Sequence, residues 1–163
     1  NLFFDMDWSV KSSIVSYGHD IEGSWLLSEA AEVLGDENLL KEVNAMALRM
    51  VNVTREEGSD SDGSIFYEKE GTHLDTDKHW WPEAEAMVGY TDAWLKTNDK
   101  SYLCSAERIW DFINLHLIDR GLGEWFWRVD KEGNTFDTDD KAGFWKCPYH
   151  NTRALIEVIN RLK

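Results

Sequence analysis

The sequence predicts an all-α protein made of helical hairpins that repeat along the chain. Apolar residues recur at helical spacing in several long segments, which is the pattern of amphipathic helices. The order helix, turn, helix and long return loop also occurs twice, with the two copies 63 residues apart. Hairpins that repeat at a fixed period stack into an open solenoid or close into a ring. We therefore expect an α/α-hairpin array in which the return loops gather on one face.

The first hairpin is expected to begin with a helix over residues 21–34, IEGSWLLSEAAEVL, whose apolar residues fall on one stripe. Gly35-Asp36 is typical of a helix end followed by the N-cap of the next helix. The second helix is predicted over residues 37–55. An acidic, glycine-containing loop follows, and its residues 64–70 are predicted to form a short β-hairpin or extended segment. Residues 1–8, NLFFDMDW, are apolar and strand-like.

The second hairpin repeats this order. A helix is predicted over residues 80–97, with Pro82 in its first turn, where proline is tolerated. Asn98-Asp99 occupies the position of Gly35-Asp36, 63 residues later, and the next helix is predicted over residues 100–118. A return loop then leads to a fifth helix, predicted from Cys147 to the last residue.

Composition limits the functions that the chain can have. Its 163 residues suit a single domain, 1–163, and 42% of them are hydrophobic, which is enough for a packed core. The formal net charge of −14 argues against nucleic acid, anionic membranes and polyanionic substrates as partners. Cys104 and Cys147 show no CxxC spacing, so we expect reduced thiols in a cytoplasmic protein. No run approaches the about 18 apolar residues of a membrane span.

The three places where a loop enters a helix are the richest in functional side chains. They contain His19, His79 and His150, and the repeat predicts that they lie side by side at one mouth of the array. His73 and His116 fall outside these joins, so we expect them to be structural or exposed. The nine tryptophans exceed what a core of this size needs, and flat indole faces also suit the stacking of sugars. Three of them at helical spacing are expected in the core, whereas two in an extended segment fit either the core or a cleft: Trp25, Trp94 and Trp110, then Trp125 and Trp127.

Four motifs carry a family resemblance: YGHDIEGSWLL, HWWPEAEA, EWFW and FWKCPYHNTR. Together they resemble the cellobiose 2-epimerases of the N-acylglucosamine 2-epimerase superfamily, and the resemblance extends over nearly the whole chain. It implies an (α/α)6 barrel, of which this chain resembles the C-terminal portion, about five helices, with short β-hairpin excursions in the loops. Because such a barrel is much longer than this chain, we expect association with another copy or with a missing N-terminal segment.

The resemblance implies a sugar 2-epimerase that inverts C2 of the reducing-end glucose of cellobiose or a related sugar. The proton is removed and returned by histidine through an enediolate, and no metal or organic cofactor is needed. The matching positions for the two acid/base groups are His19 and His150. The resemblance also implies a set of substrate-binding residues at the matching positions: Glu22, Trp80, Trp81, Glu85, Trp145 and Arg153.

These residue types suit that chemistry. Exchange at C2 needs a base on one face of the carbon and an acid on the other, and histidine can do either because its ordinary pKa is about 6.5. His19 and His150 are 131 positions apart, so they can reach one carbon from different helices. Glu22, one helical turn after His19, could orient that ring. Arg153, one turn after His150, could support His150 or stabilise the enediolate oxygen.

Two other functions remain open from the sequence. An (α/α)6 glycoside hydrolase would use paired carboxylates, and the candidates are Glu22, Glu83, Glu85 and Glu124. A non-catalytic carbohydrate-binding or assembly module would use the same aromatic side chains without any proton transfer. The acidic stretches SDSDG and FDTDDK lack the pattern of a calcium loop, so we expect solvated loops there.

Overall fold

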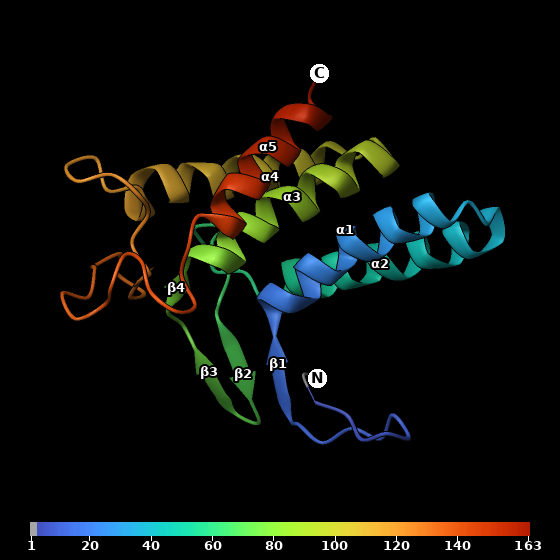
Figure 1. The fold of residues 1–163 in the computed structure, drawn as a ribbon, viewed down its shortest axis with the longest axis horizontal. Helices are drawn as coiled ribbons and strands as arrows, with labels where there is room; N and C mark the ends of the chain where they lie inside the picture. The colour runs from blue at the N-terminus through green and yellow to red at the C-terminus, as the bar shows by residue number, and fades with distance from the viewer. Residues whose placement is uncertain (1–2) are drawn as a thin grey trace.

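Two helical hairpins and a fifth helix form the body of the protein (Figure 1). The computed structural model describes residues 3–163. The first hairpin pairs α1 (Tyr17–Leu34) with α2 (Glu37–Glu57), and the second pairs α3 (Trp80–Thr97) with α4 (Lys100–Phe112). Helix α4 continues directly into a π-helical turn, η1 (Ile113–Leu117), and α5 spans Tyr149–Arg161. Helix α3 lies at the centre, packed against α1, α4 and α5.

The two interhelical turns have matching geometry, as the repeat predicts. Gly35 and Asn98 end α1 and α3 in the left-handed conformation, with φ of 75° and 57°. Asp36 and Asp99 then cap α2 and α4 by accepting hydrogen bonds from backbone N–H groups of the first turn. Both hairpins therefore have the same kind of turn, a left-handed residue followed by an aspartate N-cap.

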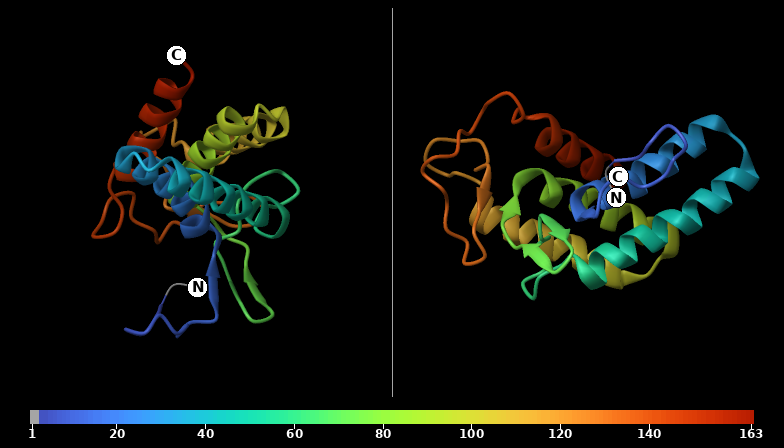
Figure 2. Two further views of the ribbon diagram at one scale, coloured as in Figure 1. Left: turned by 90° about the vertical axis from the view of Figure 1, so that its right-hand side faces the viewer. Right: turned by 90° about the horizontal axis from the view of Figure 1, so that it is seen from below.

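Within residues 3–163 the helices are joined by five short strands, and the labelled ones, β1 to β4, lie near the starts of α1 and α3 (Figures 1 and 2). Strands β1 (Ile14–Ser16), β2 (Glu68–Glu70) and β3 (His73–Asp75) form an antiparallel sheet in the order β1-β2-β3, with Val15 opposite Lys69 and Lys69 opposite Leu74. Strand β4 (Lys78–His79) pairs with β5 (Arg128–Val129). Because β1 runs directly into α1 and β4 into α3, these strands fix where both helices begin.

Several predicted boundaries were wrong. Helix α1 begins at Tyr17 and not at residue 21, because β1 delivers the chain directly into the helix, so His19 lies in the first helical turn. The predicted extended segment 64–70 begins as a strand only at residue 68, and its hairpin partner is 73–75. Residues 3–8 do not form the expected strand, because Phe4 makes only an isolated bridge to Val10; residues 1–2 of that segment lie outside the described range.

The predicted helix over residues 100–118 keeps α-helical geometry only to Phe112, where the π-turn takes over. The fifth helix begins at Tyr149 and not at Cys147, with Pro148 at its N-cap.

The apolar core follows α3, which is buried along most of its length. The residues that fill it include Ile21, Trp25, Ala84, Val88, Ile109, Ile113 and Trp125. Trp94 packs half-buried against this core, as expected for a stripe residue. Trp110 was wrongly predicted to be core: it is 38% exposed and lines an apolar groove of about 440 Å³ between α3, α4 and α5. None of the helices in the described range is long and apolar enough to cross a membrane.

Candidate functional site

A pocket of about 470 Å³ is lined by residues from the starts of α1, α3 and α5. This is the convergence that the repeat predicts for the three histidine-bearing joins. Its walls come from all three helices and from the return loops. The lining residues are His19, Glu22, Tyr67, His79, Trp80, Trp81, Trp127, Trp145 and His150. Six of the eight predicted site residues therefore face one cavity, and the other two, Glu85 and Arg153, contact His150 or Glu22 directly.

His19 stands exposed in the pocket in the first turn of α1. Its Nδ1 lies 2.8 Å from the Oγ of Ser16, the residue that immediately precedes the helix. Its ring packs against the indole of Trp81, with the ring centres 4.6 Å apart. Ser16 is itself only 1% exposed, so this hydroxyl holds the imidazole from a fixed position.

His150 enters from α5, and a buried carboxylate holds it. Its Nδ1 lies 2.6 Å from Oε1 of Glu85, which is fully buried on α3. The ring packs against the same Trp81 indole that His19 contacts, at 5.6 Å between centres. Both histidines thus have Nδ1 anchored and share one aromatic wall. With Nδ1 engaged in each ring, Nε2 is the nitrogen that remains for proton transfer at the cavity that both rings line.

Arg153 joins two carboxylates behind His150. One guanidinium nitrogen, Nη2, donates to Oε1 of Glu22 and to Oε1 of Glu85, each at 2.6 Å. Burial works against its charge, but the hydrogen bonds and charges of the two carboxylates outweigh it and raise the pKa of Arg153 above its usual range. Arg153 therefore acts on His150 through Glu85. Glu22 pairs with Arg153, and the support for His19 comes from Ser16, a role that the sequence suggested for Glu22.

The sequence reading missed a further contact of Glu85. The indole Nε1 of Trp25 donates to Oε2 of Glu85 at 3.1 Å, so the carboxylate has donors on both oxygens. Trp25 is core, as predicted, and only 1% exposed, but it is also polar support for the site. The one signal for it was its place in the motif YGHDIEGSW, one turn after Glu22.

His79 and Tyr67 form a stacked pair in the pocket wall, with ring centres 3.8 Å apart and an interplanar angle of 17°. Burial, assisted by the nearby Arg128, lowers the pKa of His79 to about 4. His79 is thus a neutral imidazole near neutral pH and cannot deliver a proton there as a charged acid. Tyr67 lies in the acidic return loop, and no sequence motif marked it.

The remaining aromatic side chains shape the two ends of the pocket. Trp80 and Trp81 are 3% and 8% exposed, and both line the cavity. Trp127 packs on Trp80 with ring centres 4.9 Å apart, and this assigns Trp127 to the cleft, whereas Trp125 belongs to the core. Trp145 is 76% exposed and lies at the outer edge. The cavity thus has a flat inner wall and an exposed indole at its rim.

The four carboxylates considered for glycoside hydrolysis are all engaged with other groups. Glu22 and Glu85 are held by Arg153, and Glu124 accepts hydrogen bonds from Lys146 and Asn151. Glu83 is fully buried, accepts the backbone N–H of Ile65, and does not line the pocket. The geometry therefore offers two anchored histidines to the cavity and no free carboxylate pair among the four.

Oxygen and nitrogen atoms of Glu22, Glu85 and His150 lie within 4.8 Å of one another, a spacing that a metal ion could use. The guanidinium of Arg153 already contacts both carboxylates and supplies the positive charge at this place. The donor set is therefore occupied by a protein cation, and we assign it no metal. In the acidic loops, Asp60 pairs with Lys78 and Asp139 with Arg128.

The sequence model of the family described as N-acylglucosamine 2-epimerase (GlcNAc 2-epimerase) matches residues 2–154. The chain belongs to this family. The cellobiose 2-epimerase of Bacteroides fragilis is 49% identical to it, over 97% of this chain and 41% of that protein. The crystal structure of a sugar epimerase from a ruminal bacterium matches with a TM-score of 0.93 and 37% identity, over 98% of this chain and 41% of that one. The cellobiose 2-epimerase structure from Bacillus thermoamylovorans matches with a TM-score of 0.90 and 39% identity, over 98% and 40%.

The comparisons confirm the expected family resemblance and the expected fold class, part of an (α/α)6 barrel. The chain spans about 41% of the length of the curated relatives it matches. The matched segment of the family model contains all eight predicted site residues, from His19 to Arg153.

Proposed function

We propose that the protein carrying this chain is a sugar 2-epimerase that inverts C2 of the reducing-end glucose of cellobiose or a similar β-1,4-linked disaccharide. The observation that carries the proposal is the pair of anchored histidines: His19 from α1 and His150 from α5 face one pocket across the indole of Trp81. The relatives named cellobiose 2-epimerase support the choice of sugar.

The proposed reaction starts from the open-chain form of the reducing-end sugar, whose C1 carbonyl makes the C2 proton acidic. Nε2 of one histidine removes that proton, and the electron pair moves toward C1 to form an enediolate. Nε2 of the other histidine donates a proton to C2 from the opposite face, and the configuration inverts. Anchoring both Nδ1 atoms holds each Nε2 at a fixed place, which is what a two-base inversion requires.

Three features of the site suit the proposed reaction. Glu85 next to Nδ1 of His150 stabilises the imidazolium that forms when this ring takes a proton. The neutral His79 and the hydroxyl of Tyr67 offer uncharged hydrogen-bonding groups to a sugar. The indoles of Trp81 and Trp145 offer apolar faces to the C–H surfaces of the two sugar rings. The proposed chemistry uses only protein groups.

The test is proton exchange at C2. The full-length protein is incubated with cellobiose in D₂O, and C2 is followed by NMR; we expect deuterium at C2 together with a mannose-configured product. His19→Ala and His150→Ala are each expected to abolish exchange while cellobiose binding survives. His73→Ala is the matched control, because His73 is an exposed histidine on β3.

The outcomes separate the candidate functions. Exchange that persists in both active-site variants would refute the assignment of the acid/base pair. Release of glucose from cellobiose would support the hydrolase reading, and binding without exchange or hydrolysis would support the non-catalytic module.

A further inference from the structure

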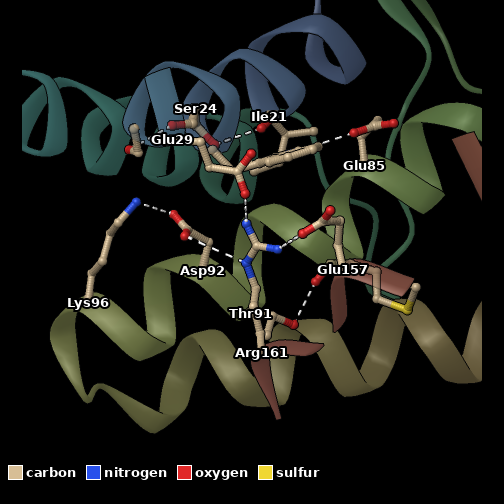
Figure 3. Close-up of polar contacts among 12 residues, drawn as sticks. Ile21, Ser24, Glu29, Glu85, Thr91, Asp92, Lys96, Glu157 and Arg161 are labelled. Carbon is tan, nitrogen blue, oxygen red and sulfur yellow. Dashed lines mark hydrogen bonds and ion pairs between the residues drawn. The ribbon is translucent and has the colours of Figure 1, made fainter. Parts of the chain in front are cut away.

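An ionic cluster ties the far end of α5 to α1 and α3 (Figure 3). Arg161 is its centre. Its Nη2 donates to Glu29 of α1 at 2.5 Å, its Nη1 donates to Glu157 of α5, and its Nε lies 3.9 Å from Asp92 of α3. Lys96 pairs with the same Asp92 at 2.5 Å. Arg161 is only 13% exposed, so its guanidinium is held in place from three helices.

The same guanidinium lies over the indole of Trp25, with 5.4 Å from its carbon to the ring centre. The guanidinium of Arg153 lies at 4.9 Å from the same ring centre. A planar cation over an indole face is attractive, and arginine makes this contact more effectively than lysine because its flat group stacks. Two arginines that enter from one helix therefore both contact the Trp25 ring.

The position of this ring matters because of what its N–H does. Trp25 donates to Oε2 of Glu85, and Oε1 of Glu85 holds Nδ1 of His150. A tilt of the indole would remove one donor from a fully buried carboxylate. The carboxylate would then turn toward its remaining donors and move the histidine with it.

We propose that Arg161 is a positioning residue for the sugar chemistry: it fixes the Trp25 ring, whose N–H holds Glu85, and Glu85 sets the orientation of His150. The inference rests on the proposed function. Neither Arg161 nor Trp25 lines the pocket, so their effect reaches the sugar through Glu85 and the groups it holds, of which His150 lines the pocket. Arg161 also lies beyond residue 154, where the match to the family model ends.

The test compares three variants of the full-length protein. Arg161→Gln removes the cation and the stacking. Arg161→Lys keeps the charge among the carboxylates but loses the planar group over Trp25. Lys96→Gln is the matched control, because it removes a cation from the same cluster without touching Trp25. For each, kcat and KM for C2 exchange are measured, together with the ring ¹⁵N signals of His150 in selectively labelled protein.

We expect Arg161→Gln to lower kcat about tenfold, with KM changed less than about twofold, and to shift the His150 ring signals. Arg161→Lys is expected to fold normally, with a kcat between those of Arg161→Gln and the unaltered protein. Lys96→Gln should leave kcat, KM and the His150 signals as they are. If Arg161→Gln does not fold, Arg161→Lys carries the comparison alone. Wild-type kcat and unchanged His150 signals in the Arg161 variants would overturn the proposal.

The two readouts also separate this proposal from the proposed function. If the unaltered protein shows no exchange at C2, the epimerase assignment fails. The ¹⁵N signals still decide whether Arg161 sets His150: a shift in the Arg161 variants but not in Lys96→Gln supports the link, and no shift refutes it.

Discussion

Two buried glutamates on α3 provide a matched test of how the site is held. Glu83 and Glu85 are both fully buried and stand two residues apart, but their partners differ. Glu85 accepts from Trp25, His150 and Arg153. Glu83 accepts only the backbone N–H of Ile65 on one oxygen, and its Oε2 has no partner among residues 3–163. Burial raises the pKa of Glu83 well above its ordinary value, so it favours the neutral form, whereas Glu85 has the guanidinium of Arg153 beside it.

The same substitution should therefore act differently at the two positions. In Glu85→Gln the amide brings two N–H donors into a place where three donors already converge, and Arg153 is left with Glu22 as its carboxylate partner. Breaking a buried charged pair costs about 3–5 kcal/mol, and we expect the lower end, about 3 kcal/mol, because Arg153 keeps one partner. Loss of the anchor on Nδ1 of His150 should lower kcat by about 100-fold or more.

Glu83→Gln is the control. An amide closely replaces a protonated carboxyl group and still accepts from Ile65, so the free energy of unfolding should change by less than about 1 kcal/mol. Its kcat should stay within about twofold of the unaltered protein. Urea unfolding gives the stabilities, and C2 exchange by NMR gives kcat. If the two variants match each other in both measurements, the carboxylate network does not hold the site as described.

Three further predictions follow from burial and close contact. The pKa of His79 is lowered to about 4 in the folded protein. As the pH falls, the imidazole is therefore protonated near pH 6.5 in the unfolded chain but only near pH 4 in the folded one. The contribution of His79 to the free energy of unfolding should fall by about 3 kcal/mol as the pH is lowered from 6.5 to 4. Because the raised pKa of Glu83 acts in the opposite direction above pH 4.5, the check is the stability of the unaltered protein minus that of His79→Phe, measured by urea unfolding at several pH values; a flat difference would contradict it. Gly18→Ala places a methyl group 2.5 Å from the ring of Trp81 and 2.9 Å from Pro82, so we expect the free energy of unfolding to fall by about 2 kcal/mol and kcat to fall as well. The control is Gly23→Ala, whose methyl group meets only the flexible end of Met50 at 3.2 Å and should not lower the stability. Equal stabilities of the two variants would count against the close approach of α1 and α3. Trp145→Ala should change the free energy of unfolding by less than about 0.5 kcal/mol, because the side chain is 76% exposed, but should raise KM on the order of tenfold. The control is Phe144→Ala, because Phe144 is 93% exposed and does not line the pocket. An equal KM in both variants would argue against a stacking role for Trp145.

Local signals in the sequence were sufficient for the helical hairpins and their turns. The pairs Gly35-Asp36 and Asn98-Asp99 act within one or two residues of themselves: the first member takes the left-handed conformation and the second caps the next helix. Boundaries set by strand pairing could not be read in the same way. Helix α1 begins at Tyr17 because β1 pairs with β2 more than fifty residues away, and no local pattern encodes that pairing.

The same distinction applies to the site. The repeat and the family motifs predicted His19, His150 and the tryptophans around them, and the structure brings them to one pocket. The partners that anchor them were not predicted. His19 is held by Ser16 and not by Glu22, and Glu85 accepts a hydrogen bond from Trp25. These contacts depend on how the helices cross.

The sequence by itself therefore determined the hairpin repeat, the turn chemistry and the residue types available at the helix starts. These follow from backbone propensities and side-chain hydrogen bonds over a few residues. The tertiary structure alone decided which carboxylate pairs with which cation. Glu22, Glu85 and Arg153 are 63 or more positions apart in sequence, but the guanidinium of Arg153 donates to both glutamates. Such contacts depend on the packing of three helices, and that packing brings together the residues proposed for the chemistry.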